Sequence, residues 1–123
     1  MPPVKKTKSS ADHYLTLAKR IRSIIEDKKA EDILILKVEG LSSITDYIVL
    51  VSGTSEPHLK VLANEIERRL MEEDNVKNIG RDGSSISQWV VLDYGGVIVH
   101  IFHKSKREFY GLETLWKDAA KIK

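Results

Sequence analysis

Apolar and polar positions alternate most clearly between residues 88 and 102. Two apolar runs, Gln88–Asp93 and Val97–Phe102, flank Gly95-Gly96, and a Gly-Gly pair at this place favours a two-residue hairpin turn that needs positive φ. With Tyr94 opposite Val97, the pairs continue in register up to Trp89 opposite Phe102. Alternation then predicts an almost wholly apolar face, which should lie on the core. Its members are Val90, Leu92, Tyr94, Val97, Val99 and Ile101.

The other face of this predicted hairpin mixes large apolar side chains with an acid and an imidazole. Its members are Trp89, Val91, Asp93, Ile98, His100 and Phe102. Such a face is either covered by a helix or offered to a partner. In this register His100 lies diagonal to Asp93, within reach of a hydrogen bond. We interpret His100 as a structural or interface histidine.

Two segments show the spacing of amphipathic helices. The first is predicted to run from a cap at Ser10 to about Lys28, and the second from a cap at Ser55 to about Glu73, with Pro57 in its first turn. The first apolar stripe is Tyr14, Leu17, Ala18, Ile21, Ile24 and Ile25, and the second is Leu59, Leu62, Ala63, Ile66 and Leu70. On the exposed side of the second helix, i,i+4 spacing predicts the ion pairs Glu65–Arg69 and Arg68–Glu72.

The remaining segments complete a mixed sheet. Glu31–Glu39 is predicted as a strand, Asp46–Ser52 as a central strand and Val76–Gly80 as a short edge strand. Arg81–Ser87 is expected to be a polar loop. Arg107 to about Ala120 is expected to form a closing helix, with Phe109, Leu112, Leu115 and Trp116 on one side. This order predicts an α/β or α+β fold with about five strands flanked by helices.

Length and composition narrow the class of protein. The 123 residues fit one domain, expected over 10–123, with Met1–Ser9 as a flexible basic tail. The net charge of +2 is too balanced for a protein whose whole surface binds nucleic acid, so we expect no DNA partner. The chain has no cysteine, no apolar run near the roughly 18 residues of a membrane span and no apolar centre of a signal peptide. We therefore expect a cytoplasmic protein without a membrane partner.

Catalytic chemistry finds little support in the sequence. The one spaced carboxylate pair, Glu65 and Glu67, falls on a predicted helix, where residues two apart point about 200° apart and cannot clasp one metal ion. The four histidines lack metal-ligand spacing. A small acid-base enzyme using Asp93 and His100 stays open as an alternative, although no aimed hydroxyl accompanies them. We expect no catalytic residues, no metal and no cofactor.

The turn Gly53-Thr54-Ser55 has two interpretations. It precedes a predicted helix whose free N–H groups could bind an anion, which would suit a nucleotide- or RNA-binding module. Helix capping explains the same residues, and no glycine-rich phosphate motif surrounds them.

Several residue types that are common in binding hot spots lie near the predicted hairpin and the closing helix. They are Arg81, Trp89, Asp93, Tyr94, Arg107 and Tyr110. We predict that they form a partner-binding surface. The alternative is ordinary core packing with a solvated rim.

Several motifs, in order, resemble those of the ribosomal silencing factors, also called Iojap-like proteins. They are SSITDYIVLVSGTSEPH (Ser42–His58), Gly83, WVVLDYGGVIVHIF (Trp89–Phe102) and R-x-x-Y-x-L-E-x-L-W (Arg107–Trp116). The resemblance spans about Asp32 to Trp116. It implies a fold similar to that of nucleotidyltransferases, without their catalytic acids.

The resemblance also implies a function. Such a factor binds the large ribosomal subunit at its intersubunit face, chiefly through ribosomal protein L14, blocks joining of the small subunit and represses translation. The tryptophan matching Trp89 is tied to this contact in the family. Crystals of the family often suggest homodimers, so a second copy is a further expected partner. Gly96 is a departure, because relatives commonly have an acidic residue there.

Overall fold

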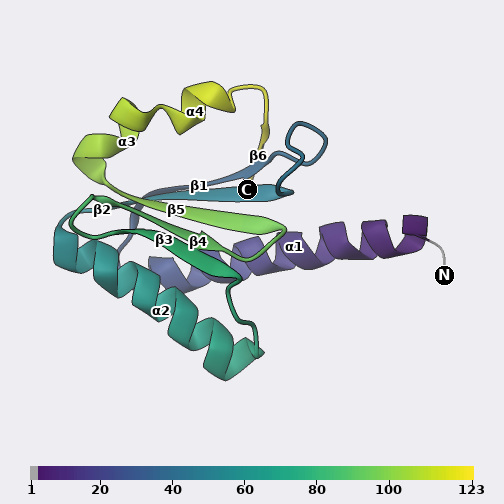
Figure 1. Cartoon of the computed structure of the whole chain (residues 1–123), viewed down its shortest axis with the longest axis horizontal. Coiled ribbons are helices and arrows are strands. Elements are labelled where there is room, and N and C mark those ends of the chain that lie inside the picture. Colours follow the sequence, from purple (N-terminus) through teal and green to yellow (C-terminus); the bar gives the residue numbers. More distant parts are fainter. Residues whose placement is uncertain (1–2) are drawn as a thin grey trace.

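A computed structural model describes residues 3–123, with side chains from residue 13 onward. It has a six-stranded sheet between two layers, with α1 and α2 on one face and α3 and α4 on the other (Figure 1). The helices are α1 (Pro3–Glu26), α2 (Glu56–Asp74), α3 (Lys104–Tyr110) and α4 (Leu112–Leu115). The strands are β1 (Glu31–Lys37), β2 (Tyr47–Gly53), β3 (Gly80–Ser84), β4 (Trp89–Asp93), β5 (Val97–His103) and β6 (Ala120–Ile122).

The sheet is mixed, which confirms the predicted α+β class. Its strand order is β3-β4-β5-β2-β1-β6, and β2 pairs with β5 in parallel, while the other neighbours are antiparallel. Every residue of β2 is buried, as expected for a central strand.

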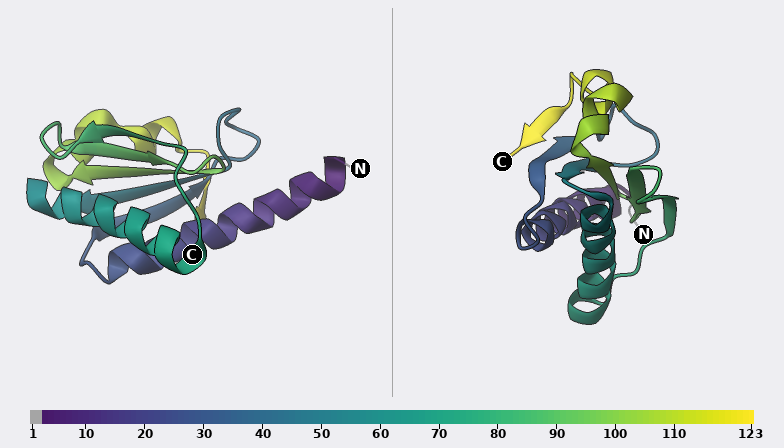
Figure 2. Two further views of the ribbon diagram at one scale, coloured as in Figure 1. Left: turned by 60° about the horizontal axis from the view of Figure 1, so that its bottom comes forward. Right: turned by 90° about the vertical axis from the view of Figure 1, so that its left-hand side faces the viewer.

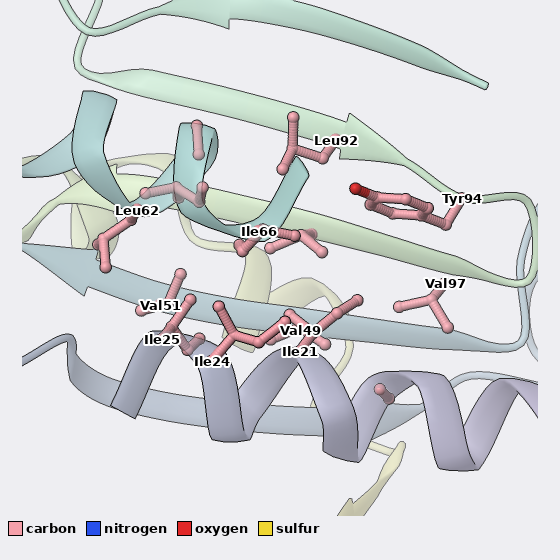
Figure 3. Packing of buried hydrophobic residues seen from close by; sticks show 14 of the residues in the cluster. Ile21, Ile24, Ile25, Val49, Val51, Leu62, Ile66, Leu92, Tyr94 and Val97 are labelled. Carbon is pink, nitrogen blue, oxygen red and sulfur yellow. The ribbon is translucent and has the colours of Figure 1, made fainter. Parts of the chain in front are cut away.

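The main core lies between the sheet and the helices α1 and α2 (Figure 3). Both predicted helix stripes and the predicted apolar face of the hairpin point into it, with Tyr14 partly buried and the other members buried. A second, smaller cluster fills the opposite face of the sheet beneath α3 and α4. Its buried members are Leu36, Val38, Ile48, Leu50, Phe102 and Ala119.

The hairpin and α2 form as their local sequence predicts. The β4–β5 register has every predicted pair from Asp93 opposite Ile98 to Trp89 opposite Phe102, and Gly95 adopts φ 84° in the turn. At the start of α2, the Ser55 hydroxyl accepts a hydrogen bond from the backbone N–H of His58 at 3.1 Å. Both predictions are confirmed. They rest on turn and cap residues, whose effect on the backbone is local and can be read from the sequence.

Both edges of the sheet differ from the prediction. The edge strand β3 covers Gly80–Ser84 instead of Val76–Gly80, so most of the expected polar loop is a strand. Four of its five residues are exposed, two of the five are glycines, and the strand pairs with β4 through its backbone, so it has no apolar alternation to reveal it. The other edge is a sixth strand, β6, which pairs with β1.

The expected closing helix is two short helices. Gly111 adopts φ 64° and separates α3 from α4. The predicted apolar side is correspondingly divided: Leu112 and Trp116 pack against the second cluster, whereas Phe109 and Leu115 are exposed.

One of the two predicted ion pairs on α2 is wrong. Arg68 bonds Glu72 at 2.9 Å as expected, but Glu65 also pairs with Arg68 instead of Arg69. Arg69 reaches Asp27, just beyond the end of α1, at 2.9 Å. Arg69 also pairs with Glu73, its i,i+4 neighbour toward the end of α2, at 3.4 Å. Two acids other than Glu65 therefore surround Arg69, and helical spacing alone does not reveal the one beyond α1.

The N-terminal helix begins earlier than expected, at Pro3 instead of Ser10. Its first turns extend past the edge of the sheet (Figure 2). Residues 1–2 lie outside the described residues, and the mobility of the basic tail stays a prediction. Among the described residues, no helix combines the length and apolar character needed to cross a bilayer.

Candidate partner-binding surface

Trp89 is the centre of an aromatic group on the outer face of the hairpin. The residue is half-buried at the start of β4, and its ring centroid lies 5.1 Å from that of Phe102 and 4.3 Å from that of Tyr110. Phe102 is its cross-strand partner on β5, and Tyr110 comes from α3, the helix that follows β5. The helix thus covers Phe102 fully and Trp89 only in part.

The rest of this face stays partly open to solvent. We call the half-buried set Trp89, Val91, Asp93, Ile98 and His100 the outer hairpin face. Alternation along the two strands places these side chains opposite the main core.

The His100 imidazole bonds to Trp89 and not to Asp93. Its Nδ1 accepts a hydrogen bond from the indole Nε1–H of Trp89 at 3.1 Å. Asp93, which the predicted register placed within reach of His100, has another partner: its carboxylate oxygen accepts a hydrogen bond from the backbone N–H of Gly95 in the turn at 2.8 Å. Burial lowers the pKa of His100 to about 4, so the ring is neutral at pH 7 and presents no charge to a partner.

Two shallow hollows lie along β3 and β4 beside Trp89. The first, of about 250 Å³, is lined by Asp82, Gly83, Ser87, Trp89, Val91 and Tyr110. The second, of about 300 Å³, is lined by Gly80, Arg81, Asp82, Val91 and Asp93. Both are lined by Asp82 and Val91, so the two hollows adjoin each other along β3 and β4.

Of the six predicted binding residues, three lie together here, Tyr94 lies in the core, and the two arginines bond within the chain. Trp89, Asp93 and Tyr110 lie on or beside the outer hairpin face. Tyr94 is 5% exposed and points into the main core, where its hydroxyl has no hydrogen-bond partner among the described residues (Figure 3). Burial raises the pKa of Tyr94.

The two predicted arginines are engaged within the chain. Arg81 borders the second hollow, but its guanidinium bonds Asn64 at 3.1 Å and Glu67 on α2. Arg107 has an 11% exposed side chain. It donates to the backbone carbonyl of Asp32, to Ser52 Oγ at 3.1 Å and to Glu113 at 2.8 Å, and so ties α3 and α4 to the ends of β1 and β2.

Asp82 and Ser87 line the first hollow and were missed by the sequence analysis. They fall in the segment that was expected to be a loop. The available signal was Gly83, which adopts φ 75° where β3 meets β4. A Cβ atom added there would lie 2.0 Å from the carbonyl oxygen of Trp89, so the two backbones approach too closely for a side chain.

The turn Gly53-Thr54-Ser55 is filled by a side chain of the protein itself. The backbone N–H of Thr54 donates to His58 Nδ1 at 3.0 Å, and His58 Nε2 bonds the carbonyl oxygen of Lys28 at 2.8 Å. The Ser55 hydroxyl accepts a hydrogen bond from the backbone N–H of His58. This arrangement uses the donors that an anion would need and favours the capping interpretation.

The two carboxylates tested for metal binding point to different partners. Glu65 bonds Arg68, and Glu67 accepts from Arg81 and from Asn78 at 2.9 Å. Within the part of the chain that the structure describes, no three His, Asp or Glu side chains form a group able to hold a metal ion.

Both the sequence and the structure of this chain resemble those of known proteins. The family model described as "Ribosomal silencing factor during starvation" matches residues 11–123. Ribosomal silencing factor RsfS of Bacillus subtilis is 40% identical over 94 residues, which are 76% of this chain and 79% of that protein. The mouse protein named "Mitochondrial assembly of ribosomal large subunit protein 1" is 30% identical over 99 residues, 76% of this chain and 42% of that protein. A crystal structure from Chromobacterium violaceum superposes with a TM-score of 0.79 at 31% identity, covering 84% of this chain and 85% of that one.

Proposed function

The chain belongs to the ribosomal silencing factor (RsfS, Iojap-like) family, and from this premise we propose that it binds the large ribosomal subunit and represses translation. In this proposal it binds at the intersubunit face through ribosomal protein L14 and keeps the small subunit from joining. The family's description and the name of the mouse relative support the large subunit as partner. The family is non-enzymatic, so a binding surface is the feature to identify.

The observation that carries this proposal is the outer hairpin face. Its large apolar groups are neither fully covered nor fully solvated, and a hollow of about 250 Å³ opens beside Trp89. A half-exposed tryptophan beside an apolar hollow is typical of an interface anchor. We propose that Trp89, Val91, Asp93 and Tyr110 contact the ribosomal protein. Arg81 and Arg107 would act indirectly, by holding β3 and α3 in place.

A matched pair of charge substitutions tests the proposed surface. Val91→Asp places a carboxylate on the outer hairpin face, and Val61→Asp makes the same change on α2, where Val61 is 46% exposed. Burying an unpaired charge in an interface costs several kcal/mol. We expect Val91→Asp to weaken co-sedimentation with purified large subunits at least roughly 30-fold, and Val61→Asp to bind as the unchanged protein does. Equal binding by the two variants would place the contact elsewhere.

Trp89→Ala measures the anchor itself. We expect a loss of about 2–4 kcal/mol in binding. The substitution also removes the stacking on Tyr110 and Phe102, so a smaller loss of folding stability, about 1–2 kcal/mol, should accompany it. Leu92→Ala is the core control, since Leu92 is fully buried and its truncation should cost about 2–5 kcal/mol of folding free energy. Loss of binding only at temperatures where Trp89→Ala unfolds would contradict the anchor role.

We further propose that the chain acts in the cytoplasm, where a bacterial relative would meet ribosomes, and that a homodimer forms in the absence of the subunit. The family resemblance supports both points. Sedimentation equilibrium of the purified chain, followed by addition of large subunits, would detect a dimer and its replacement by a one-to-one complex.

A further inference from the structure

Helix α3 presents one aromatic ring outward. Phe109 is 78% exposed, whereas the adjacent Tyr110 packs inward on Trp89. The Phe109 ring meets Tyr110 edge-on at 5.4 Å, and Lys106 Nζ lies 5.8 Å from its centroid. Because Arg107 fastens this helix to the sheet, the ring is held on a fixed support.

The charges around this ring differ in sign from those of the domain body. From Lys104 to Lys123 the chain has six Lys or Arg and three Asp or Glu, whereas residues 12–103 have eleven Lys or Arg and fifteen Asp or Glu. The C-terminal segment is therefore basic beside an acidic body, and the three lysines of Met1–Ser9 make the other basic segment of the chain. This charge pattern favours an anionic partner at α3 and the residues that follow it, or at the N-terminal segment.

One cation beside the ring is available to such a partner. Lys106 is exposed and forms no ion pair with another described residue. Lys104 is two positions away and therefore points about 200° away from Lys106, and it lines a hollow with Asp32, Glu108 and Glu113. The third cation of the helix, Arg107, is already engaged with Asp32, Ser52 and Glu113. Partner binding at Lys106 would thus break no ion pair of the described chain.

We propose that the outer face of α3 is an RNA-contact site, in which Phe109 stacks on an unpaired base and Lys106 meets the adjoining phosphate. An exposed apolar ring alone would suit a protein partner equally well. The ammonium group of Lys106 beside the ring favours RNA, because single-stranded RNA offers a π-face and a phosphate together. The site goes beyond the proposed protein contact and adjoins it, since Tyr110 touches both Phe109 and Trp89.

The test uses RNA that carries no ribosomal protein, so that its outcome does not depend on the contact proposed above. Binding of the full chain to a labelled oligouridylate and to protein-free large-subunit ribosomal RNA would be followed by fluorescence anisotropy. Phe109→Ala should weaken binding roughly 10-fold, which corresponds to one stacked base, and Phe109→Trp should restore it. Lys106→Gln should reduce the slope of log affinity against log salt by about 0.7.

Leu115→Ala is the matched control, because Leu115 is a 68% exposed apolar residue of the same layer without a ring, and its loss should leave RNA affinity unchanged. Thermal melts should show all five variants folded, Phe109→Leu included. The proposal is overturned if the unchanged chain binds neither RNA, or if Phe109→Leu binds RNA as well as Phe109 does. It is also overturned if Phe109→Ala lowers co-sedimentation with large subunits but not RNA affinity, because the ring would then contact a protein.

Discussion

At the scale of single residues, Gly96 and Tyr14 are fitted to each other. A Cβ atom added to Gly96 would lie 2.1–2.3 Å from three ring carbons of Tyr14. Tyr14 belongs to α1, and its ring packs against the two glycines of the hairpin turn. This chain therefore has room only for hydrogen at position 96, and Gly96 is part of the packing between α1 and the hairpin.

Gly96→Asp should cost about 1–3 kcal/mol of folding free energy, because the ring of Tyr14 must move to admit the new side chain. The cost should fall to well under half of that in a chain that also carries Tyr14→Ala, since the obstacle is then absent. Urea denaturation of the two single variants and the double variant measures the coupling. Strictly additive losses would contradict the packing described here.

His100 should make stability depend on pH. Its pKa is lowered from 6.5 to about 4 in the folded chain, so below pH 6.5 the unfolded chain binds the proton more readily. The folded state is therefore at its full stability, as far as His100 is concerned, above pH 6.5. As the pH falls toward 4, its free energy of unfolding decreases by about 1–3 kcal/mol.

His100→Gln keeps an acceptor for the Trp89 indole and removes the titration. Its unfolding free energy should therefore decline less between pH 7 and pH 4.5 than that of the unchanged chain. Parallel declines in the two proteins would mean that His100 is protonated in the folded state.

At the scale of elements, the helices and strands that short sequence motifs stabilise were also the ones that could be predicted from the sequence. The β4–β5 hairpin follows from a Gly-Gly turn and strict alternation, and α2 follows from the Ser55 cap and its apolar stripe. The edge strand β3 and the last strand β6 could not be predicted in this way. β3 contains only glycines and polar side chains, and β6 has only three residues, which is too short for a pattern. Both are strands because β4 and β1 offer unpaired backbone groups.

The break between α3 and α4 depends on Gly111. Its φ of 64° suits glycine, so Gly111→Ala should destabilise the fold by about 1 kcal/mol. Gly80→Ala is the control, because Gly80 has no positive φ and its added Cβ would meet nothing within 4 Å. Differential scanning calorimetry should show a lower Tm for the first variant alone. A Gly111→Ala protein as stable as the control would indicate that α3 and α4 can join into the continuous helix that the sequence suggested.

At the scale of the whole molecule, three of the residues predicted from the sequence, Trp89, Asp93 and Tyr110, lie on or beside one face, but the sequence could not separate the proposed binding surface from the residues that support it. Arg81 and Arg107 have the chemistry of interface residues, and their partners Glu67 and Asp32 lie far away in the chain. Only the folded arrangement shows that both guanidinium groups are engaged. Tyr94 likewise has an interface side chain, but alternation places it in the core.

Deleting Met1–Ser9 should leave the domain folded. Among the side chains that the structure describes, the core members on α1 begin at Tyr14, beyond the deleted segment. We expect the Tm to change by less than about 5 °C, which is roughly 1 kcal/mol for a domain of this size. A larger drop would show that the tail is docked on the domain. Circular dichroism melts of the full and shortened chains decide between the two.

The parallel pairing of β2 with β5 has a consequence for synthesis of the chain. β2 leaves the ribosome early, and its seven residues are all buried in the finished domain. Its neighbour β1 is made just before it, but the partner on its other side, which pairs Tyr47 with Val97, follows only after α2, β3 and β4. A nascent chain must therefore keep one side of its most apolar strand unpaired until the second hairpin has emerged. The centre of the sheet closes among the last events of translation, and a chain released before Val97 exposes an unpaired apolar strand to aggregation.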